Sequence, residues 1–389
     1  MPPVLPAYER ISRIRPASED EFLLQSIFLD GEEAECARYK WRRMVNIDEI
    51  AAHSINLLPL FYRKYRSREK DTLLEIAKGV FRRTFYTNTM LFHEAARVIN
   101  CLNEQGIDTL LLKGAALANT CYESISLRPM EDVDILIPYK QRRKAVAYLE
   151  REGWRMPHHA IRSKELLFLE KHGEEFRNRC GRAIDVHWNI FYASRHEHLD
   201  ELCWAEAAPF ALASAHTKIF EPNDQLLHIC IHGLSYRPNT QLRWIADALT
   251  ILSSSRIDWD KLLLRADKRR VLLQTKDALS YLSSKYAAPV PQEVLDSLAI
   301  FPETEKDYVL YSYYSFPNAP QEFLLDSFRY PRTLRKIVYC WRRYLISLWT
   351  FKTEEQCAAM GRLAKLFGLL QYMRIQGKRS NSALNRASR

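Results

Sequence analysis

A short change in hydrophobic period near residue 130 constrains this fold more than any other feature of the chain. Val133, Ile135 and Ile137 alternate with Asp132 and Asp134. Alternate residues of a strand point the same way, about 7 Å apart, so this pattern predicts a strand with an apolar inner face and both aspartates on the other face. We therefore expect a sheet within a chain whose other patterns are mostly helical.

A strand, a glycine turn and a helix precede this aspartate strand. Thr109–Leu112 forms a short apolar run that stops at Lys113-Gly114, and a helix of small residues begins at Ala115. Because free backbone N–H groups at the start of a helix bind anions well, the Lys-Gly turn is a candidate phosphate cradle.

A second acidic strand is expected downstream. Ala183–His187 reads as a strand with Asp185 and His187 on one face, joined to a preceding strand around His172, Gly173 and Glu174. Asp185 could thus meet Asp132 and Asp134. Three carboxylates can hold hard divalent cations, and a pair of ions can stabilise both the attacking and the leaving oxygen in a displacement at phosphorus.

The rest of the chain has helical spacing. Ser18 and Glu21 match a capping box, Leu91 to Leu102 forms a helical stripe closed by Gly106, and helical periodicity returns from Asp224 onward. The predicted organisation is a helical region at 1–84, an α/β core at 85–215, a helical lobe at 216–377 and a disordered basic tail at 378–389.

The net charge of +10 is unevenly distributed. Residues 327–389 hold fourteen basic and two acidic residues, which leaves 43 basic and 45 acidic in the first 326. Within this segment, 337–351 mixes aromatic, aliphatic and arginine residues. It can close the helical lobe, contact a membrane surface peripherally, or bind an anionic partner such as RNA.

The eight cysteines form no C-x-x-C pair, which is typical of reduced thiols in a cytosol. We see neither a signal peptide nor an apolar run of 18 residues that could span a membrane. These observations predict a cytoplasmic protein.

The segments "LLLKGAALANTCYESISLRPMEDVDILI", "AIDVHWN", "NDQLLHICIHGLSY" and "LRWIADALTIL" together resemble the polymerase-beta-like nucleotidyltransferases. Within them, they resemble the branch labelled uncharacterised nucleotidyltransferases. The resemblance spans about Ser18 to Leu252. It implies an α+β fold with a small mixed sheet flanked by helical N-terminal and C-terminal regions.

The resemblance also implies a reaction and its residues. Asp132, Asp134 and Asp185 look like the catalytic carboxylates that bind Mg²⁺ or Mn²⁺, and Gly114 looks like the glycine of the phosphate turn. The expected reaction transfers a nucleoside monophosphate from a nucleoside triphosphate, ATP first, to an acceptor hydroxyl, with release of pyrophosphate. The acceptor can be a small molecule, a peptide, a protein or RNA.

One position departs from the family pattern. The superfamily usually has glycine-serine at the turn, whereas this chain has Gly114-Ala115. The backbone N–H groups there, with Lys113 and Arg128, would have to hold the phosphates. This departure leaves open an inactive nucleotide-binding sensor or scaffold. The basic residues 327–389 leave open a nucleic-acid or membrane-surface adaptor.

Several assignments keep alternatives at this point. Glu174 or Glu175 can replace Asp185, and His187 can orient Asp185, simply pack, or act directly. Lys113 and Arg128 can be surface cations. His228 and His232 have the i, i+4 spacing of a zinc pair but no H-E-x-x-H motif, so we interpret them as core histidines or as histidines that orient a neighbouring side chain.

Overall fold

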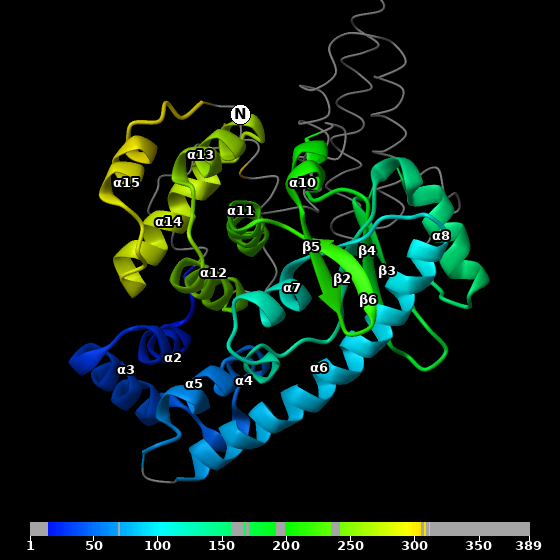
Figure 1. Ribbon diagram of the computed structural model, residues 1–389. Helices are drawn as coiled ribbons and strands as arrows, with labels where there is room; N and C mark the ends of the chain where they lie inside the picture. The colour runs from blue at the N-terminus through cyan, green and yellow to red at the C-terminus, as the bar shows by residue number, and fades with distance from the viewer. Residues whose placement is uncertain are drawn as a thin grey trace, which may run out of the picture. The chain divides into compact units, whose positions relative to one another are not determined.

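The computed structural model of the chain is described here for most of its first 311 residues (Figure 1). The described residues are 15–68, 71–156, 167–168, 171–191, 199–234, 242–304, 307–308 and 311. The chain divides into two compact units, Met1–Ala319 and Pro320–Arg389. The predicted tail at 378–389 and the basic segment 327–389 therefore lie outside the described residues.

Helices precede the sheet. They are α2 (Ser18–Phe28), α3 (Gly31–Met44), η1 (Ile47–Glu49), α4 (Ala52–Ile55), α5 (Leu58–Tyr65) and α6 (Thr72–Glu104). The side chain of Asp71 caps α6 by accepting from the N–H of Leu74 at 2.9 Å, and Gly106, at φ +66°, follows its end. The predicted stripe on α6 is buried, and its glycine stop is confirmed.

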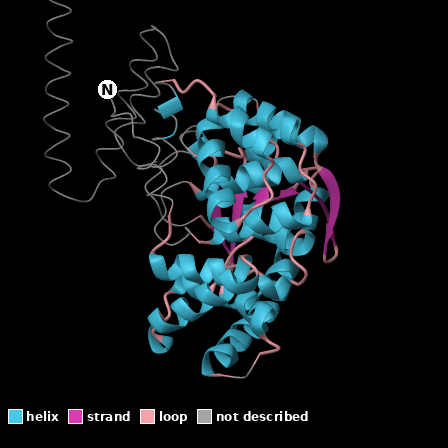
Figure 2. Cartoon of the chain, turned by 90° about the vertical axis from the view of Figure 1, so that its left-hand side faces the viewer, coloured by secondary structure: helices cyan, strands magenta, loops and turns pink. Residues whose placement is uncertain are grey.

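The sheet has six strands in the order β3-β4-β2-β1-β6-β5. The strands are β1 (Leu110–Leu111), β2 (Asp134–Leu136), β3 (Gly173–Arg177), β4 (Ala183–His187), β5 (Ala208–Leu212) and β6 (Ala215–Ile219). The pairs β1–β6 and β2–β4 are parallel, and the other three are antiparallel. The predicted α+β fold with a mixed sheet is confirmed; Figure 2 shows its strands among many helices.

The remaining helices connect the strands or follow them. They are α7 (Lys113–Thr120), η2 (Ile125–Leu127), η3 (Tyr139–Gln141), α8 (Arg142–Arg151), α10 (Asp200–Glu206), α11 (Pro222–Gly233), α12 (Arg243–Ser254), α13 (Trp259–Lys268), α14 (Leu272–Tyr286) and α15 (Gln292–Ala299). No helix in these described segments is both long enough and apolar enough to cross a membrane.

Two hydrophobic cores hold these elements. One joins the sheet to α8 and to the second half of α6. The other joins the helices before the sheet to those after it, so that Trp41 and Phe61 belong to the same core as Ile245 and Tyr281. In Figure 1 the blue N-terminal helices and the yellow-green helices accordingly lie on one side of the sheet.

Two local predictions are corrected, and one hairpin was missed. Ser18 is the first residue of α2 and does not cap it; Ala17 is the N-cap, and the Glu21 carboxylate accepts from Arg15 Nε at 2.7 Å. His172-Gly173-Glu174 is not a turn between strands, because β3 begins at Gly173 and turns at 178–182, where Asn178 accepts from two backbone N–H groups. The hairpin β5–β6 was not predicted, because its exposed β5 has little apolar alternation.

The domain boundaries at 84, 215 and 377 remain predictions. Helix α6 runs across the first of them, and β6 extends the sheet beyond the second.

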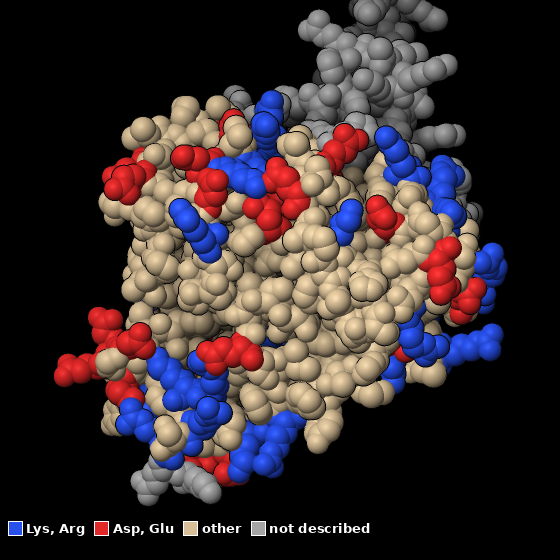
Figure 3. All heavy atoms as spheres, in the orientation of Figure 1, with Lys and Arg blue, Asp and Glu red and all other residues tan. Residues whose placement is uncertain are grey.

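Charges of both signs are interspersed on the face seen in Figure 3. Lys and Arg gather over α3, α5 and the start of α6, but several of them are paired there, as in Arg42 with Asp71 and Arg63 with Glu123. This face agrees with the near balance of charge in the first 326 residues.

Candidate active site

The Lys-Gly turn lies where β1 ends and α7 begins. Leu112 is extended, and α7 starts at Lys113, whose φ of +45° is in the left-handed region that only glycine adopts without cost. Such backbone strain is frequent at functional sites. The helix thus starts two residues earlier than predicted, and Lys113 is its first residue.

Gly114 is required by a close approach. A Cβ at this position would lie 2.3 Å from Arg128 Nη1 and 2.6 Å from Met130 Sδ. Any larger residue would push the guanidinium away. The neighbouring Ala115 is buried in the core of the sheet, and its methyl side chain has no hydrogen-bonding group, so only its backbone can contribute to the predicted cradle.

Two of the predicted carboxylates meet on neighbouring parallel strands. Asp134 on β2 is in register with Asp185 on β4, and Leu136 is in register with His187. His187 Nε2 lies 3.0 Å from Asp134 Oδ1 and 3.1 Å from Asp185 Oδ2, and Lys113 Nζ donates to Asp134 Oδ1 at 2.6 Å. Asp134, Asp185 and His187 each offer an atom within 4.8 Å of the others.

The two cations set the charge state of these carboxylates. Burial alone would raise the pKa of Asp134, but Lys113 and His187 hold it well below its usual range. Against the same effect of burial, His187 also lowers the pKa of Asp185. Burial would lower the pKa of His187, yet the two aspartates raise it to about 9. At neutral pH the cluster therefore contains two carboxylates and two cations.

Asp132 lies beside this cluster but is not part of it. The strand β2 starts at Asp134, so Asp132 precedes it and is half-buried. Burial and the charge of Asp134 together raise the pKa of Asp132 to about 6, although Lys113 acts to lower it. The site thus holds one carboxyl group whose negative charge its neighbours do not neutralise.

This donor set fits a divalent cation. Carboxylate oxygens are the ligands that Mg²⁺ and Mn²⁺ prefer. Asp134 and Asp185 already converge within one ligand shell, and a cation would neutralise the excess charge of Asp132. Among the described residues, this is the one group of three or more His, Cys, Asp or Glu side chains with such geometry.

Arg128 also reaches the turn, but it is buried rather than exposed. Its Nε and Nη2 donate to Asp247 Oδ1 and Oδ2 at 3.1 and 2.8 Å. Burial acts to lower its pKa, but Asp247 raises the pKa of Arg128 above its usual value. Arg128 is thus a fixed cation beside Gly114 and not a surface arginine.

The comparison with known proteins decides the family. The profile of a family described as "Uncharacterised nucleotidyltransferase" matches residues 41–284, well over half of the chain. The chain belongs to this nucleotidyltransferase family. The matched range contains Lys113, Gly114 and the Asp134–Asp185–His187 cluster, and it ends before the basic segment.

No curated protein matches the sequence of this nucleotidyltransferase. Among solved structures, the lincosamide antibiotic adenylyltransferase LnuA with lincomycin bound shares 15% identity and a TM-score of 0.30, over 42% of this chain and 97% of that chain. An antigenic nucleotidyltransferase-like protein from Paracoccidioides brasiliensis shares 16% identity and a TM-score of 0.35, over 53% of this chain and 96% of that chain. The antibiotic-resistance factor ANT(2'')-Ia shares 13% identity and a TM-score of 0.33, over 48% of this chain and 92% of that chain. At these TM-scores none of the three supports an argument about substrate.

The remaining alternatives can now be placed. Glu174 pairs with Lys171, and Glu175 pairs with Arg177, so neither substitutes for Asp185 in the cluster. His187 contacts both aspartates, which agrees with its orienting them.

His228 is buried, with its ring edge-on to Phe191 and Phe220, as expected for a core histidine. His232 lies one turn further along α11, and the two ring centroids are 6.1 Å apart.

Sequence reasoning missed two residues that lie next to the candidate site, both on α12. Asp247 holds Arg128, and Arg243 lies close enough for its charge to lower the pKa of Asp132. Nε of Arg243 is buried without a hydrogen-bond partner among the described residues, and burial lowers the pKa of Arg243. Their i, i+4 spacing within the apolar segment "LRWIADALTIL" is the signal that could have found them.

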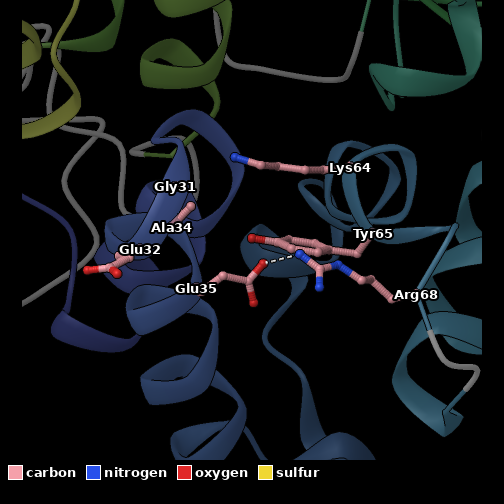
Figure 4. A pocket seen from close by; sticks show the side chains of 7 residues that line it. All are labelled: Gly31, Glu32, Ala34, Glu35, Lys64, Tyr65 and Arg68. Carbon is pink, nitrogen blue, oxygen red and sulfur yellow. Dashed lines mark hydrogen bonds and ion pairs between the residues drawn. The ribbon is translucent and has the colours of Figure 1, made fainter.

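A separate surface pocket of about 610 Å³ lies between α3 and α5 (Figure 4). Its two basic side chains already have partners: Arg68 pairs with Glu35, and Lys64 donates to the carbonyl of Ile27. Its lining contains no member of the carboxylate cluster. We assign it no part in nucleotidyl transfer.

Proposed function

We propose that this protein is a metal-dependent nucleotidyltransferase that moves a nucleoside monophosphate from a nucleoside triphosphate to an acceptor hydroxyl and releases pyrophosphate. The metal is Mg²⁺ or Mn²⁺, and ATP is the first triphosphate to test. The acceptor is a small molecule, a peptide, a protein or RNA. We keep the cytoplasm as the expected compartment.

The convergence of Asp134 and Asp185 beside the unneutralised Asp132 carries this proposal. These three carboxylates would hold the cations. When bound, the cations would neutralise charge on the attacking and leaving oxygens at phosphorus. Asp134 and Asp185 lie on neighbouring parallel strands and Asp132 directly precedes one of them, so the fold positions all three carboxylates for a substrate.

The chain's own residues supply the other roles. Asp185 has the more exposed side chain of the two cluster aspartates, at 28% against 11% for Asp134. It is therefore the one that an acceptor hydroxyl can reach, and we assign it the acceptance of that hydroxyl's proton. His187 donates to the carboxylates and keeps them oriented.

Phosphate binding falls to the glycine turn. We assign the backbone N–H groups of Gly114 and Ala115 to the phosphates, together with Lys113 and Arg128. Both cations are already held at the turn, Lys113 by Asp134 and Arg128 by Asp247. Catalysis then consists mainly of positioning and charge neutralisation.

The test is transfer of label from each of the four labelled ribonucleoside triphosphates, with Mg²⁺ and a cell extract as the source of acceptor. We expect labelled product and pyrophosphate from the wild type, and neither from Asp132→Ala or Asp134→Ala. Asp108→Asn is the matched control, because Asp108 is 68% exposed just before β1. Equal labelling by all four proteins would refute the assigned site.

The inactive alternative gives a different result in the same assay. A sensor or scaffold would bind a triphosphate in a way that depends on Asp134 but would release no pyrophosphate with any extract.

A further inference from the structure

We propose that Asp247, on helix α12, is a positioning residue that aims the Arg128 guanidinium at the Lys113-Gly114 phosphate turn. Its role would be to set how tightly the turn binds a triphosphate. The inference rests on the proposed function, since it specifies how one phosphate-binding cation of that same site is held.

The backbone of Arg128 is held from one side. Asn88 on α6 is fully buried, and its Nδ2 donates to the carbonyls of Ile125 and Arg128 at 2.6 and 2.9 Å. The segment that delivers Arg128 to the site is thereby fixed to the longest helix of the fold. These hydrogen bonds hold the backbone of Arg128 independently of the contacts that its side chain makes.

The side chain of Arg128 is held from the other side. Asp247 accepts from Nε and Nη2, and the hydroxyl of Tyr122 donates to Asp247 Oδ1 at 2.7 Å. The two partners of the ion pair are only 8% and 2% exposed. A bidentate pair of a planar guanidinium with a carboxylate fixes both position and plane, which one contact could not do.

The nitrogens that Asp247 engages determine where the remaining one points. Nη1 makes neither hydrogen bond to Asp247, and it lies 2.3 Å from where a Cβ of Gly114 would be. Nη1 is therefore the donor that faces the turn. Because the guanidinium is rigid, rotation of the Asp247 carboxylate would move Nη1 away from Gly114.

Stability alone could also explain a buried ion pair, and the fold contains one that serves as a control. Arg265 Nη1 lies 2.9 Å from Asp224 Oδ2, and these side chains are 7% and 4% exposed. This pair joins α13 to α11 and involves neither Gly114 nor the carboxylate cluster. Breaking the Arg128–Asp247 pair leaves Arg128 without the carboxylate that holds it, whereas Arg265 keeps Glu206 at 2.8 Å, so Asp247→Asn should lose more stability than Asp224→Asn.

The first experiment compares Asp247→Asn with Asp224→Asn in the full-length protein. Each of the four ribonucleoside triphosphates with Mg²⁺ is titrated by calorimetry, well below both melting temperatures. We expect Asp247→Asn to weaken binding about tenfold or more, the scale of one lost charge-assisted hydrogen bond, with a rise in KM larger than the fall in kcat. Asp224→Asn should bind as the wild type does. Equal weakening in both variants would overturn the inference.

The second experiment replaces both partners, because removal of a buried pair as a whole can leave stability nearly unchanged. The double variant Arg128→Met/Asp247→Leu should melt closer to the wild type than Arg128→Met alone, yet still bind the triphosphate about tenfold more weakly. Recovery of both stability and affinity would mean that the pair is only structural and would overturn the inference.

Tyr122→Phe is the milder variant if Asp247→Asn does not fold. It removes one hydrogen bond to Asp247 and keeps the ion pair, so we expect a smaller weakening, about two- to fivefold. Unchanged binding in this variant would count against the inference. Failure of the proposed function has a different signature, since the wild type would then release no pyrophosphate with any extract, or Asp134→Asn would bind triphosphate as the wild type does.

Discussion

At the scale of single residues, the site balances charges that the fold has buried. Asp134 accepts from Lys113 and contacts His187, so its negative charge is compensated. Asp132 has no such partner among the described residues, and burial with the nearby charge of Asp134 raises its pKa to about 6. The two aspartates of one Asp-x-Asp motif therefore contribute to stability with opposite signs.

This difference predicts that Asp132→Asn stabilises the metal-free protein and Asp134→Asn destabilises it. Removing the uncompensated charge of Asp132 should raise the free energy of unfolding by about 1–3 kcal/mol at pH 7. Removing the charge of Asp134 leaves Lys113 and His187 without this carboxylate and should lower the free energy of unfolding by about 3–5 kcal/mol. Thermal melts in EDTA measure both. Both variants should lose transfer by about 10²–10³-fold. A destabilised Asp132→Asn would contradict the assignment of its charge as uncompensated.

A second residue-scale prediction concerns His228. Burial, together with the positive charges of Lys113 and His187, holds its pKa well below 6.5. The folded protein then keeps His228 neutral while the unfolded chain takes up a proton below about pH 6.5, so stability falls as the pH falls. His228 then lowers the free energy of unfolding by up to about 1.4 kcal/mol for each pH unit below this value. Between pH 7.5 and 5.5, His228→Phe should lose less stability than the wild type; parallel curves would contradict this.

At the scale of elements, close helix contact depends on one glycine. A Cβ on Gly233, at the end of α11, would come within 2.0 Å of the Trp244 ring on α12. Helix α12 carries Asp247 and Arg243, so this contact also sets the distance of both residues from the turn.

We therefore predict that Gly233→Ala destabilises the fold by about 1–3 kcal/mol or more, the cost of overpacking a core. Gly79→Ala is the matched control, because Gly79 is inside α6 with nothing within 4 Å of an added Cβ. This second variant should gain about 0.5–1 kcal/mol from helix propensity. Urea unfolding measures the change in the free energy of unfolding of each variant. If both variants changed in the same direction, the packing explanation would be wrong.

At the scale of the whole molecule, the site and the basic excess belong to different parts of the chain. The residues assigned to the site lie between Lys113 and Asp247, within the compact unit Met1–Ala319, and the family match ends at residue 284. The basic segment 327–389 begins after the end of this unit and after the end of the family match.

Deletion of residues 327–389 should therefore leave triphosphate binding and pyrophosphate release unchanged within about twofold. If this segment binds an anionic partner, the deletion should remove a binding that falls steeply with salt. Calorimetry with Mg²⁺-triphosphate and filter binding to RNA at 50 and 200 mM salt measure the two effects separately. Loss of triphosphate binding on deletion would place part of the site in the segment.

The sequence by itself determined what depends on neighbours along the chain. The periods of two and 3.6, the glycine stop of α6 and the strand from Ala183 to His187 follow from local patterns. Motif resemblance added the family and named the aspartates. Local signals failed at Ser18, where Glu21 accepts from Arg15 instead, and at the hairpin β5–β6, which joins the sheet by pairing with the distant β1.

Only the tertiary structure decided which residues meet. The register of β2 with β4 brings Asp134 to Asp185 and His187 and leaves Asp132 outside the strand. The shared core of the N-terminal and C-terminal helices brings Asp247 to Arg128 across 119 residues. The physical reason is that burial and ion pairing depend on distances in space between segments far apart in the sequence, which no local period encodes.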